Sequence, residues 1–284
     1  MRKTEVVDRR PLAFGGLCNS RCPCTFTLFK DYSLKVCVAQ IAPVKGNVHF
    51  NIERHKKLID LAVSIEADLV IFPELSITGY EPLLAKELAT EKDDSRFDVF
   101  QQISDGKKIT IGIGMPLKSQ EGISIGMIIF QPQQPRQVYL KEYIHSDEEP
   151  FFVCGKNSSN ILPAMQEKIA LAICYEISIP QHTATAVENG ATIYIASVAK
   201  SVTGAANAIE TLSATAKNYS MTVLMSNCIG YCDNFESGGR TSIWNSDGIL
   251  VAQLDDKTEG VLTIDTKTQI VGKKYIESTV STTL

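Results

Sequence analysis

Long apolar runs are missing from this chain of 284 residues. Its longest apolar segments, residues 123–130 and 193–199, are far shorter than the roughly 18 residues that a membrane-spanning helix needs. An excess of positive charge is missing as well, because 32 acidic against 28 basic residues give a net charge of −4. Without a basic stripe we expect no nucleic-acid partner and no membrane partner, and a small molecule is the better expectation for the ligand.

A regular cysteine framework is also lacking. The eight cysteines do not follow the spacing of a small secreted domain, and several lie in apolar segments, which favours a reducing, cytoplasmic location. Cys18, Cys22 and Cys24 lie close together in the sequence, but they have neither the paired spacing nor the histidines of a zinc site. We therefore expect no metal and no cofactor.

The first 33 residues differ from the rest of the chain. They mix basic and acidic residues and lack the apolar core of a secretory signal. The first alternating apolar segment follows them at residues 34–42, and no later shift in composition marks a linker. We expect a disordered N-terminal extension over residues 1–33 and one catalytic domain over residues 34–284.

Apolar periodicity predicts that helices and strands alternate along this domain. Such alternation is typical of a layered α/β protein with its helices on the outside. Strands are expected at residues 34–42, 69–72, 109–115, 126–131, 137–140, 169–173, 192–197, 222–227, 241–244, 249–254 and 260–264, and helices at residues 47–66, 83–88, 96–103, 181–189 and 205–220.

Three expected strands end on residues that are capable of chemistry. Cys174, Glu74 and Lys141 each follow an apolar segment, where a turn presents the side chain. Attack on an amide carbonyl needs a thiolate, a group that takes and returns its proton, and positive charge where the oxyanion develops. These three residues supply such a set. Each by itself is more often an inert buried thiol, a turn cap or a solvated lysine.

The residues around these positions resemble the nitrilase, or carbon–nitrogen hydrolase, superfamily, whose triad is a Glu, a Lys and a Cys in this order. The matching stretches are FPELSITGY at 72–80, LK at 140–141 and ICYE at 173–176. The similarity extends from about residue 34 to about residue 264. It implies a four-layer α-β-β-α sandwich with a catalytic triad, and the joint occurrence of the motifs favours this interpretation over coincidence.

The resemblance also implies a second glutamate that orients the lysine. The stretch DEEPFFVCG at 147–155 is similar to the family's glutamate-bearing segment, which precedes an aromatic pair and a glycine. Counting back from Phe152 favours Glu148, and Glu149 is the alternative. Without the resemblance, a run of acidic residues is typical of a solvated loop.

Substrate contacts are expected from loops that follow strand ends, because such loops carry specificity. Tyr80, Tyr175 and Ser197 are the candidates, and ordinary loop packing is an equally good account of them. Many relatives have a Pro-Glu and a nearby Arg after the nucleophile that can hold a substrate carboxylate. Residues 179–182 read IPQH instead, which does not favour a carboxylate-terminated substrate. His182 is expected to be solvated, and a polar contact is the alternative.

Our leading hypothesis for the function is hydrolysis of a small linear amide or N-carbamoyl compound through a thioester on Cys174. Tyr175 favours an amide over a nitrile, because nitrilases of the superfamily commonly carry Trp after the nucleophile. Alternatives are nitrile hydrolysis, acyl transfer to an amine at the same triad, and a ligand-binding relative without turnover. The resemblance further implies a homodimer or higher homo-oligomer, which the charge-poor helices expected at 181–189 and 205–220 suit.

Overall fold

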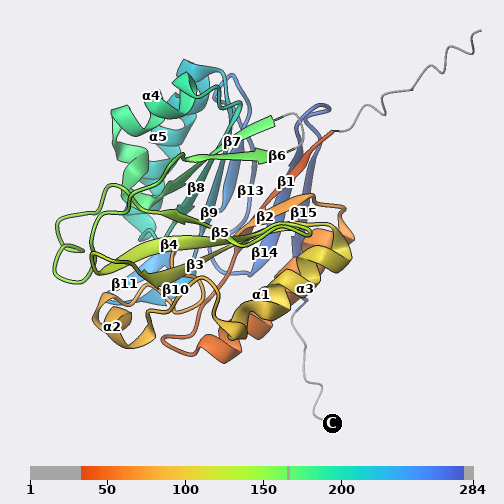
Figure 1. Cartoon of the computed structure of the whole chain (residues 1–284). Helices are drawn as coiled ribbons and strands as arrows, with labels where there is room; N and C mark the ends of the chain where they lie inside the picture. The colour runs from red at the N-terminus through yellow and green to blue at the C-terminus, as the bar shows by residue number, and fades with distance from the viewer. Residues whose placement is uncertain (1–32, 165–166, 278–284) are drawn as a thin grey trace, which may run out of the picture. The chain divides into compact units, whose positions relative to one another are not determined.

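Two β-sheets, stacked face to face, form the centre of the protein, for which a computed structural model describes residues 33–164 and 167–277 (Figure 1). The N-terminal extension expected over residues 1–33 lies, apart from Ser33, outside the described residues. The described part belongs to one compact unit, Ser33–Leu284. No helix in this part of the chain is long and apolar enough to cross a bilayer.

The first sheet has seven strands in the order β15-β14-β1-β2-β3-β4-β5. The three central strands β1, β2 and β3 run parallel, and the flanking pairs are antiparallel. Their bounds are β1 (Lys35–Gln40), β2 (Leu69–Ile71), β3 (Thr110–Lys118), β4 (Ile123–Phe130), β5 (Gln137–Leu140), β14 (Gly260–Asp265) and β15 (Val271–Tyr275).

The second sheet has six strands in the order β13-β12-β9-β8-β7-β6. Its strands β7, β8 and β9 run parallel, so their carboxyl ends meet at one edge. A separate two-stranded hairpin follows β9 in the chain. The bounds are β6 (Ile161–Ala164), β7 (Glu167–Ile173), β8 (Ile193–Val198), β9 (Thr222–Asn227), β12 (Ser242–Trp244) and β13 (Leu250–Gln253), with β10 (Ile229–Cys232) and β11 (Phe235–Gly238) in the hairpin.

Helices cover the outer face of each sheet (Figure 1). On the first sheet lie α1 (Val48–Ser64) and α3 (Asp98–Lys107), and on the second lie α4 (Pro180–Glu188) and α5 (Val202–Tyr219). Short helices η1 (Pro82–Leu84), α2 (Ala85–Leu88), η2 (Ser95–Phe97) and η3 (Cys174–Ser178) lie in the connections. Asn47 and Ser201 cap α1 and α5, because their side-chain oxygens accept backbone N–H groups of the first turns.

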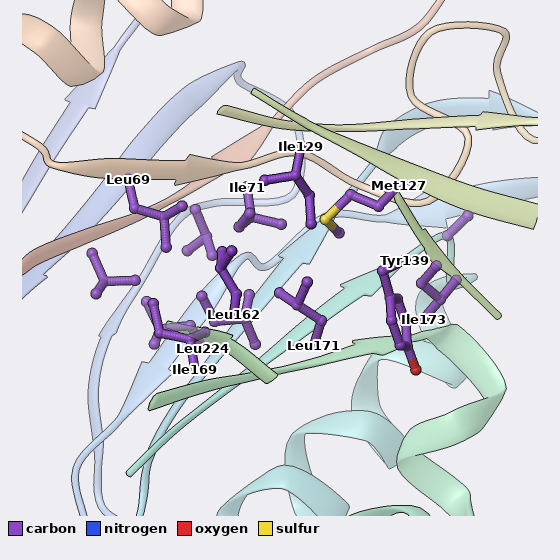
Figure 2. Close-up of a cluster of buried hydrophobic side chains, with 14 of the residues drawn as sticks. Leu69, Ile71, Met127, Ile129, Tyr139, Leu162, Ile169, Leu171, Ile173 and Leu224 are labelled. Carbon is purple, nitrogen blue, oxygen red and sulfur yellow. The ribbon is translucent and has the colours of Figure 1, made fainter. Parts of the chain in front are cut away.

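The core between the sheets follows from the alternation of side chains along each strand. In β2, Leu69 and Ile71 point to the inner face, while Val70 points to the helices. Figure 2 shows this inner cluster, in which side chains of the first sheet meet Leu171 and Ile173 of β7. The order of layers is therefore helix, sheet, sheet, helix, and the expected four-layer sandwich is confirmed.

Candidate active site

The ends of β2, β5 and β7 bring the three expected catalytic residues to one place. Lys141 follows β5 directly, Cys174 follows β7 directly, and Glu74 lies three residues beyond β2. The Nζ atom of Lys141 lies 2.8 Å from Oε1 of Glu74. Cys174 is near enough to both residues for their charges to affect the pKa of its thiol. Residues 33 to 100 positions apart in the sequence thus form one cluster.

The turn that carries Glu74 is fixed by close packing against β3. Leu75 adopts a left-handed backbone conformation with φ of 49°. Opposite it, Gly114 of β3 has no side chain, and an added Cβ would lie 2.3 Å from Leu75 N and 2.5 Å from Pro73 O. Ser76 Oγ lies 2.9 Å from Nε2 of the buried His55 in α1. The sequence of the turn and the glycine opposite it together set the position of Glu74.

Lys141 is fully buried and lies between two carboxylates. Besides Glu74, it donates to both carboxylate oxygens of Glu148, at 2.7 and 2.9 Å. Burial by itself would lower the pKa of Lys141, but the negative charges of Glu74, Cys174 and Glu148 outweigh that effect and raise it. The ammonium group therefore stays charged, which a group that stabilises an oxyanion must do.

Glu148, rather than Glu149, contacts the lysine. Glu148 is buried and also accepts hydrogen bonds from the Tyr80 hydroxyl (2.9 Å) and the backbone N–H of His145 (2.7 Å). Glu149 is exposed and lines a neighbouring surface pocket. The structure decides between the two alternatives because a four-residue turn points consecutive side chains in different directions, which the sequence run by itself does not show.

Glu74 combines burial with an unused acceptor. Burial raises the pKa of its carboxyl group, against the opposing effect of the Lys141 charge. Its Oε2 atom is buried and has no hydrogen-bond partner within the described part of the chain. A carboxylate with a raised pKa and a free acceptor atom beside a thiol has the properties of a general base.

Cys174 adopts a strained backbone conformation at the point where β7 passes into η3. Its φ of 45° lies in the left-handed region, which residues other than glycine seldom adopt. Burial, followed by the negative charge of Glu74, raises the pKa of its thiol to about 11. The free protein therefore holds a thiol at neutral pH, and attack requires a base that removes the proton during the reaction.

A pocket of about 630 Å³ opens onto Cys174. This volume is in the range of small-molecule sites. Its walls combine aromatic and aliphatic side chains with a few charged ones. They include Tyr80, Pro82, Leu83, His145, Asp147, Glu148, Phe151, Tyr175, Lys200, Ser201, Asp233 and Phe235.

Two of the three expected substrate contacts line this pocket. Tyr80 and Tyr175 are part of its wall, and Tyr175 packs edge-on against His145 with ring centroids 5.1 Å apart. Ser197 is not in the wall: it is buried in β8, and its hydroxyl donates to the carbonyl of Phe72 (2.8 Å). This hydrogen bond joins the second sheet to the chain just before Glu74. Ser197 therefore has a structural contact with Phe72 in place of the expected contact with the substrate.

The sequence expectation missed a buried polar network behind the nucleophile. Glu176 accepts the backbone N–H groups of Ile173 and Glu142, each at 2.6 Å, and the hydroxyl of Tyr139 at 2.8 Å. Burial raises the pKa of its carboxyl group to about 7. The sequence feature that could have indicated this network is an acidic residue, Glu176, two positions after the cysteine. Its carboxylate bridges the ends of β5 and β7.

The expectation that His182 is solvated is wrong. His182 is buried, because α4 turns it inward against β8. Its ring nitrogens lie 2.9 Å from the Tyr139 hydroxyl and 3.0 Å from the Tyr194 hydroxyl. Burial lowers the pKa of the imidazole to about 4, so the ring is neutral at neutral pH.

No cluster of three or more His, Cys, Asp or Glu side chains suited to a metal ion is found within residues 33–164 and 167–277. The triad instead contains the ammonium group of Lys141, which is hydrogen-bonded to the carboxylates of Glu74 and Glu148. This arrangement is suited to proton transfer and to stabilisation of negative charge.

Residues 35–273 match the family model described as carbon–nitrogen hydrolase. The chain belongs to the carbon–nitrogen hydrolase family. The name of this family refers to hydrolysis of carbon–nitrogen bonds. The family match covers all three strand ends described above and both sheets, apart from the last two residues of β15.

Curated relatives are similar over part of their own length. The chain is 26% identical over 230 residues to the glutamine-dependent NAD(+) synthetase of Acinetobacter baylyi, covering 78% of this chain and 42% of that protein. It is 29% identical over 135 residues to the protein N-terminal amidase of Saccharomyces cerevisiae, covering 44% of this chain and 29% of that protein. The chain therefore spans about two fifths of the synthetase that it matches.

Solved structures of an amidase from Nesterenkonia sp. AN1 share this fold. A cysteine mutant of that amidase in complex with butyramide matches with a TM-score of 0.75 at 19% identity, over 82% of this chain and 90% of the other. A glutamate mutant, in which the acetamide moiety of fluoroacetamide is covalently added at the active-site cysteine, matches with a TM-score of 0.74 at 19% identity, over 82% and 89%.

Proposed function

We propose that this carbon–nitrogen hydrolase cleaves a small linear amide or N-carbamoyl compound through a thioester on Cys174. The observation that carries the proposal is the position of Lys141 Nζ between Glu74 and Glu148, beside a pocket that opens onto Cys174. A base, a cation and a nucleophile then lie within one cluster, as amide hydrolysis requires.

In the acylation step, the sulfur of Cys174 attacks the amide carbon while Glu74 takes the thiol proton. The amide oxygen becomes an oxyanion, which Lys141 Nζ and the backbone N–H of Tyr175 stabilise. Protonation of Glu74 weakens its bond to Nζ and frees that N–H for the oxyanion. Glu74 then passes the proton to the nitrogen, the carbon–nitrogen bond breaks, and ammonia or an amine leaves a thioester behind.

In the deacylation step, Glu74 removes a proton from water as the water oxygen attacks the thioester carbon. The carbon–sulfur bond breaks, the proton returns to sulfur, and the acid is released. The high pKa of the Cys174 thiol, about 11, favours its return to the protonated state at neutral pH. Glu148 keeps Lys141 in place throughout both steps, because it holds Nζ through two hydrogen bonds.

The names of the relatives support an amide as substrate. One relative is glutamine-dependent, another is an N-terminal amidase, and the similar solved structure holds butyramide. These names refer to glutamine, to amidases and to butyramide, and none of them refers to a nitrile. A carboxamide on a short chain is accordingly our proposal for the reacting group.

A mass measurement on the intact protein tests this proposal. Incubation with a panel of short carboxamides and N-carbamoyl compounds is expected to add the acyl group to Cys174 and to release ammonia. The Cys174→Ala variant is the control, and the exposed Cys154 reports non-specific acylation. Adducts on Cys154 but not on Cys174, or the absence of both adduct and ammonia, would contradict the proposal. Formation of a new amide on addition of an amine would instead assign acyl transfer.

We also propose that the protein forms a homodimer or higher homo-oligomer. The outer helix α5 supports this, since it exposes the apolar Val202 and the aromatic Tyr219. Light scattering at micromolar concentration is expected to give at least twice the mass of one 31.2 kDa chain. A single-chain mass over the accessible concentration range would contradict it.

A further inference from the structure

Lys200 is a second lysine in the pocket, and the mechanism above does not use it. It follows β8 by two residues, next to the strand that carries Cys174, and it lines the same pocket. Within residues 33–164 and 167–277 it forms no ion pair, whereas Lys141 is paired with two carboxylates. Burial has the largest effect on the pKa of the Cys174 thiol and raises it. The positive charges of Lys200 and Lys141 lower this pKa, and Lys200 has the larger effect of the two.

The backbone of Lys200 is held in place. Its N–H donates to Asn227 Oδ1 (2.9 Å), and its carbonyl accepts from the Gly238 N–H (2.8 Å) and the Ser237 hydroxyl (3.1 Å). The side chain passes over Gly204, since a Cβ at that glycine would lie 3.4 Å from Lys200 Cβ and 3.8 Å from its Cδ. The backbone of Lys200 is therefore fixed beside the pocket that the residue lines.

The pocket is also lined by the acidic residues Asp147, Glu148 and Asp233, and within the described part of the chain none of them forms an ion pair with Lys200; Glu148 is paired with Lys141. Asp147 is paired with His145 (2.6 Å) and both are exposed. Asp233 is exposed on the hairpin that β10 and β11 form. The wall near the nucleophile also includes the rings of Phe151 and Phe235, which suit an aliphatic chain. A ligand that complements this pocket has a carboxamide for Cys174, a short apolar linker and one negative group.

We propose that Lys200 binds a carboxylate of the substrate, so that the enzyme prefers short amides that carry a carboxylate in the acyl part. This inference rests on the proposed function at Cys174 and narrows its substrate class. It also assigns the carboxylate site to the loop after β8, because residues 179–182, after the nucleophile, lack the arginine that can hold a substrate carboxylate in many relatives. A lysine–carboxylate contact in a partly desolvated pocket is charge-assisted and therefore strong.

Paired substrates and variants test the inference by turnover. Succinamate and glutaramate are compared with butyramide, which has a similar length and no carboxylate. The ratio of kcat/KM for the carboxylate amide to kcat/KM for butyramide is expected to fall roughly 10- to 100-fold in Lys200→Met, mainly through KM. Lys200→Arg is expected to restore much of the ratio. Lys156→Met, at an exposed lysine paired with Glu121, is the matched control and should leave the ratio unchanged.

Binding to the inactive protein keeps the test separate from turnover. Calorimetry on Cys174→Ala is expected to show tighter binding of succinamate or glutaramate than of butyramide, and this advantage should be lost in the double variant with Lys200→Met. Equal affinities of Cys174→Ala and of the double variant for the carboxylate amide would overturn the inference. It would also be overturned if Lys200→Met kept the substrate preference and shifted only the pH profile of turnover, because Lys200 would then act only by lowering the pKa of the Cys174 thiol. If carboxylate amides bind through Lys200 but no acyl adduct forms on Cys174, the proposed function fails and the binding site stands.

Discussion

The two sheets contribute unequally to the active site. The first sheet supplies Glu74, Lys141 and Glu148, which are buried and held together by short hydrogen bonds. The second sheet supplies Cys174 and Lys200, which are partly exposed to the pocket, and Lys200 is without an ion pair within the described part of the chain. On the buried side only Glu74 Oε2 lacks a partner among these three residues of the described chain, whereas on the exposed side Cys174 has a strained backbone and Lys200 has an unpaired charge within the same part of the chain.

This difference predicts different consequences of mutation. Removal of one partner from a buried ion pair leaves an uncompensated charge, which is costly to stability. A change on the exposed side removes no such compensation and alters mainly binding or chemistry. Stability and activity should therefore change together on the first-sheet side and separately on the second-sheet side.

The largest expected effect is the loss of activity in Cys174→Ala. Turnover of the best amide should fall by more than about 10³-fold, because no thioester can form. The melting temperature should change little, since only a small, partly exposed group is removed. Steady-state kinetics and a thermal melt check both parts. A variant that hydrolyses the amide at a comparable rate would show that Cys174 is not the nucleophile.

The next largest effects are expected for Glu74→Gln and Lys141→Met. A neutral amide cannot transfer the proton and a thioether offers no charge to the oxyanion, so kcat should fall about 10²- to 10⁴-fold in each. Lys141→Met should also lower the free energy of unfolding by several kcal/mol, roughly 3 to 5, because two buried carboxylates lose their cation. A variant with near-normal kcat would exclude that residue from the mechanism.

A further prediction compares two neighbouring glutamates of one turn through the substitutions Glu148→Gln and Glu149→Gln. Glu148→Gln should lower both kcat and the melting temperature, since a charge-assisted bond to Lys141 is worth roughly 1.5 to 3 kcal/mol. Glu149→Gln changes an exposed side chain and should leave both within error. Equal effects of the two substitutions would contradict the orientation of the turn that the structure shows.

Gly114→Ala tests whether packing between strands positions the base. The added Cβ would lie 2.3 Å from Leu75 N, so the Glu74 turn has to shift, at a cost of about 1 to 3 kcal/mol and with a lower kcat. Gly106→Ala in α3 is the matched control, because nothing lies within 4 Å of its added Cβ. That variant should be neutral or more stable. Unchanged kcat in Gly114→Ala would show that the turn tolerates displacement.

The last prediction concerns the pH dependence of stability at Glu176, away from the reacting groups. Burial raises the pKa of this carboxyl group from 4.5 to about 7 in the folded protein. Between these values the folded state holds more protons than the unfolded state, so its contribution is complete below pH 4.5 and is lost as pH rises towards 7. Over this window the stability of the wild type should fall by about 3 kcal/mol relative to Glu176→Gln. Parallel melting curves of the two proteins from pH 4.5 to 7 would contradict the shift.

The sequence predicted the elements that have strong apolar periodicity and missed those that lack it. The expected helix at 47–66 and the strands at 137–140 and 222–227 agree with α1, β5 and β9. The missed strands β6 and β15 are short edge strands with few buried side chains, and the hairpin β10–β11 contains exposed residues and Gly230. Edge strands depend on pairing with a distant neighbour, which local periodicity does not report.

The same distinction applies to the candidate site. Cys174, Glu74 and Lys141 were recognised because each closely follows an apolar strand and each is flanked by a recognisable motif. The burial of His182 and the hydrogen bonds of Glu176 were not predicted from the sequence. Both depend on the packing of α4 and β5 against β7 and β8.

By itself the sequence determined the order of helices and strands, the family motifs and the three strand ends that carry Glu74, Lys141 and Cys174. These features depend on local periodicity and on residue types at fixed spacings. Only the tertiary structure decided that Glu148 contacts Lys141 while Glu149 is exposed, that Ser197 bonds to Phe72, and that Lys200 faces the pocket without an ion pair within the described part of the chain. The physical reason is that the direction of a side chain in a turn, and the charges around it, are set by contacts between segments far apart in the chain.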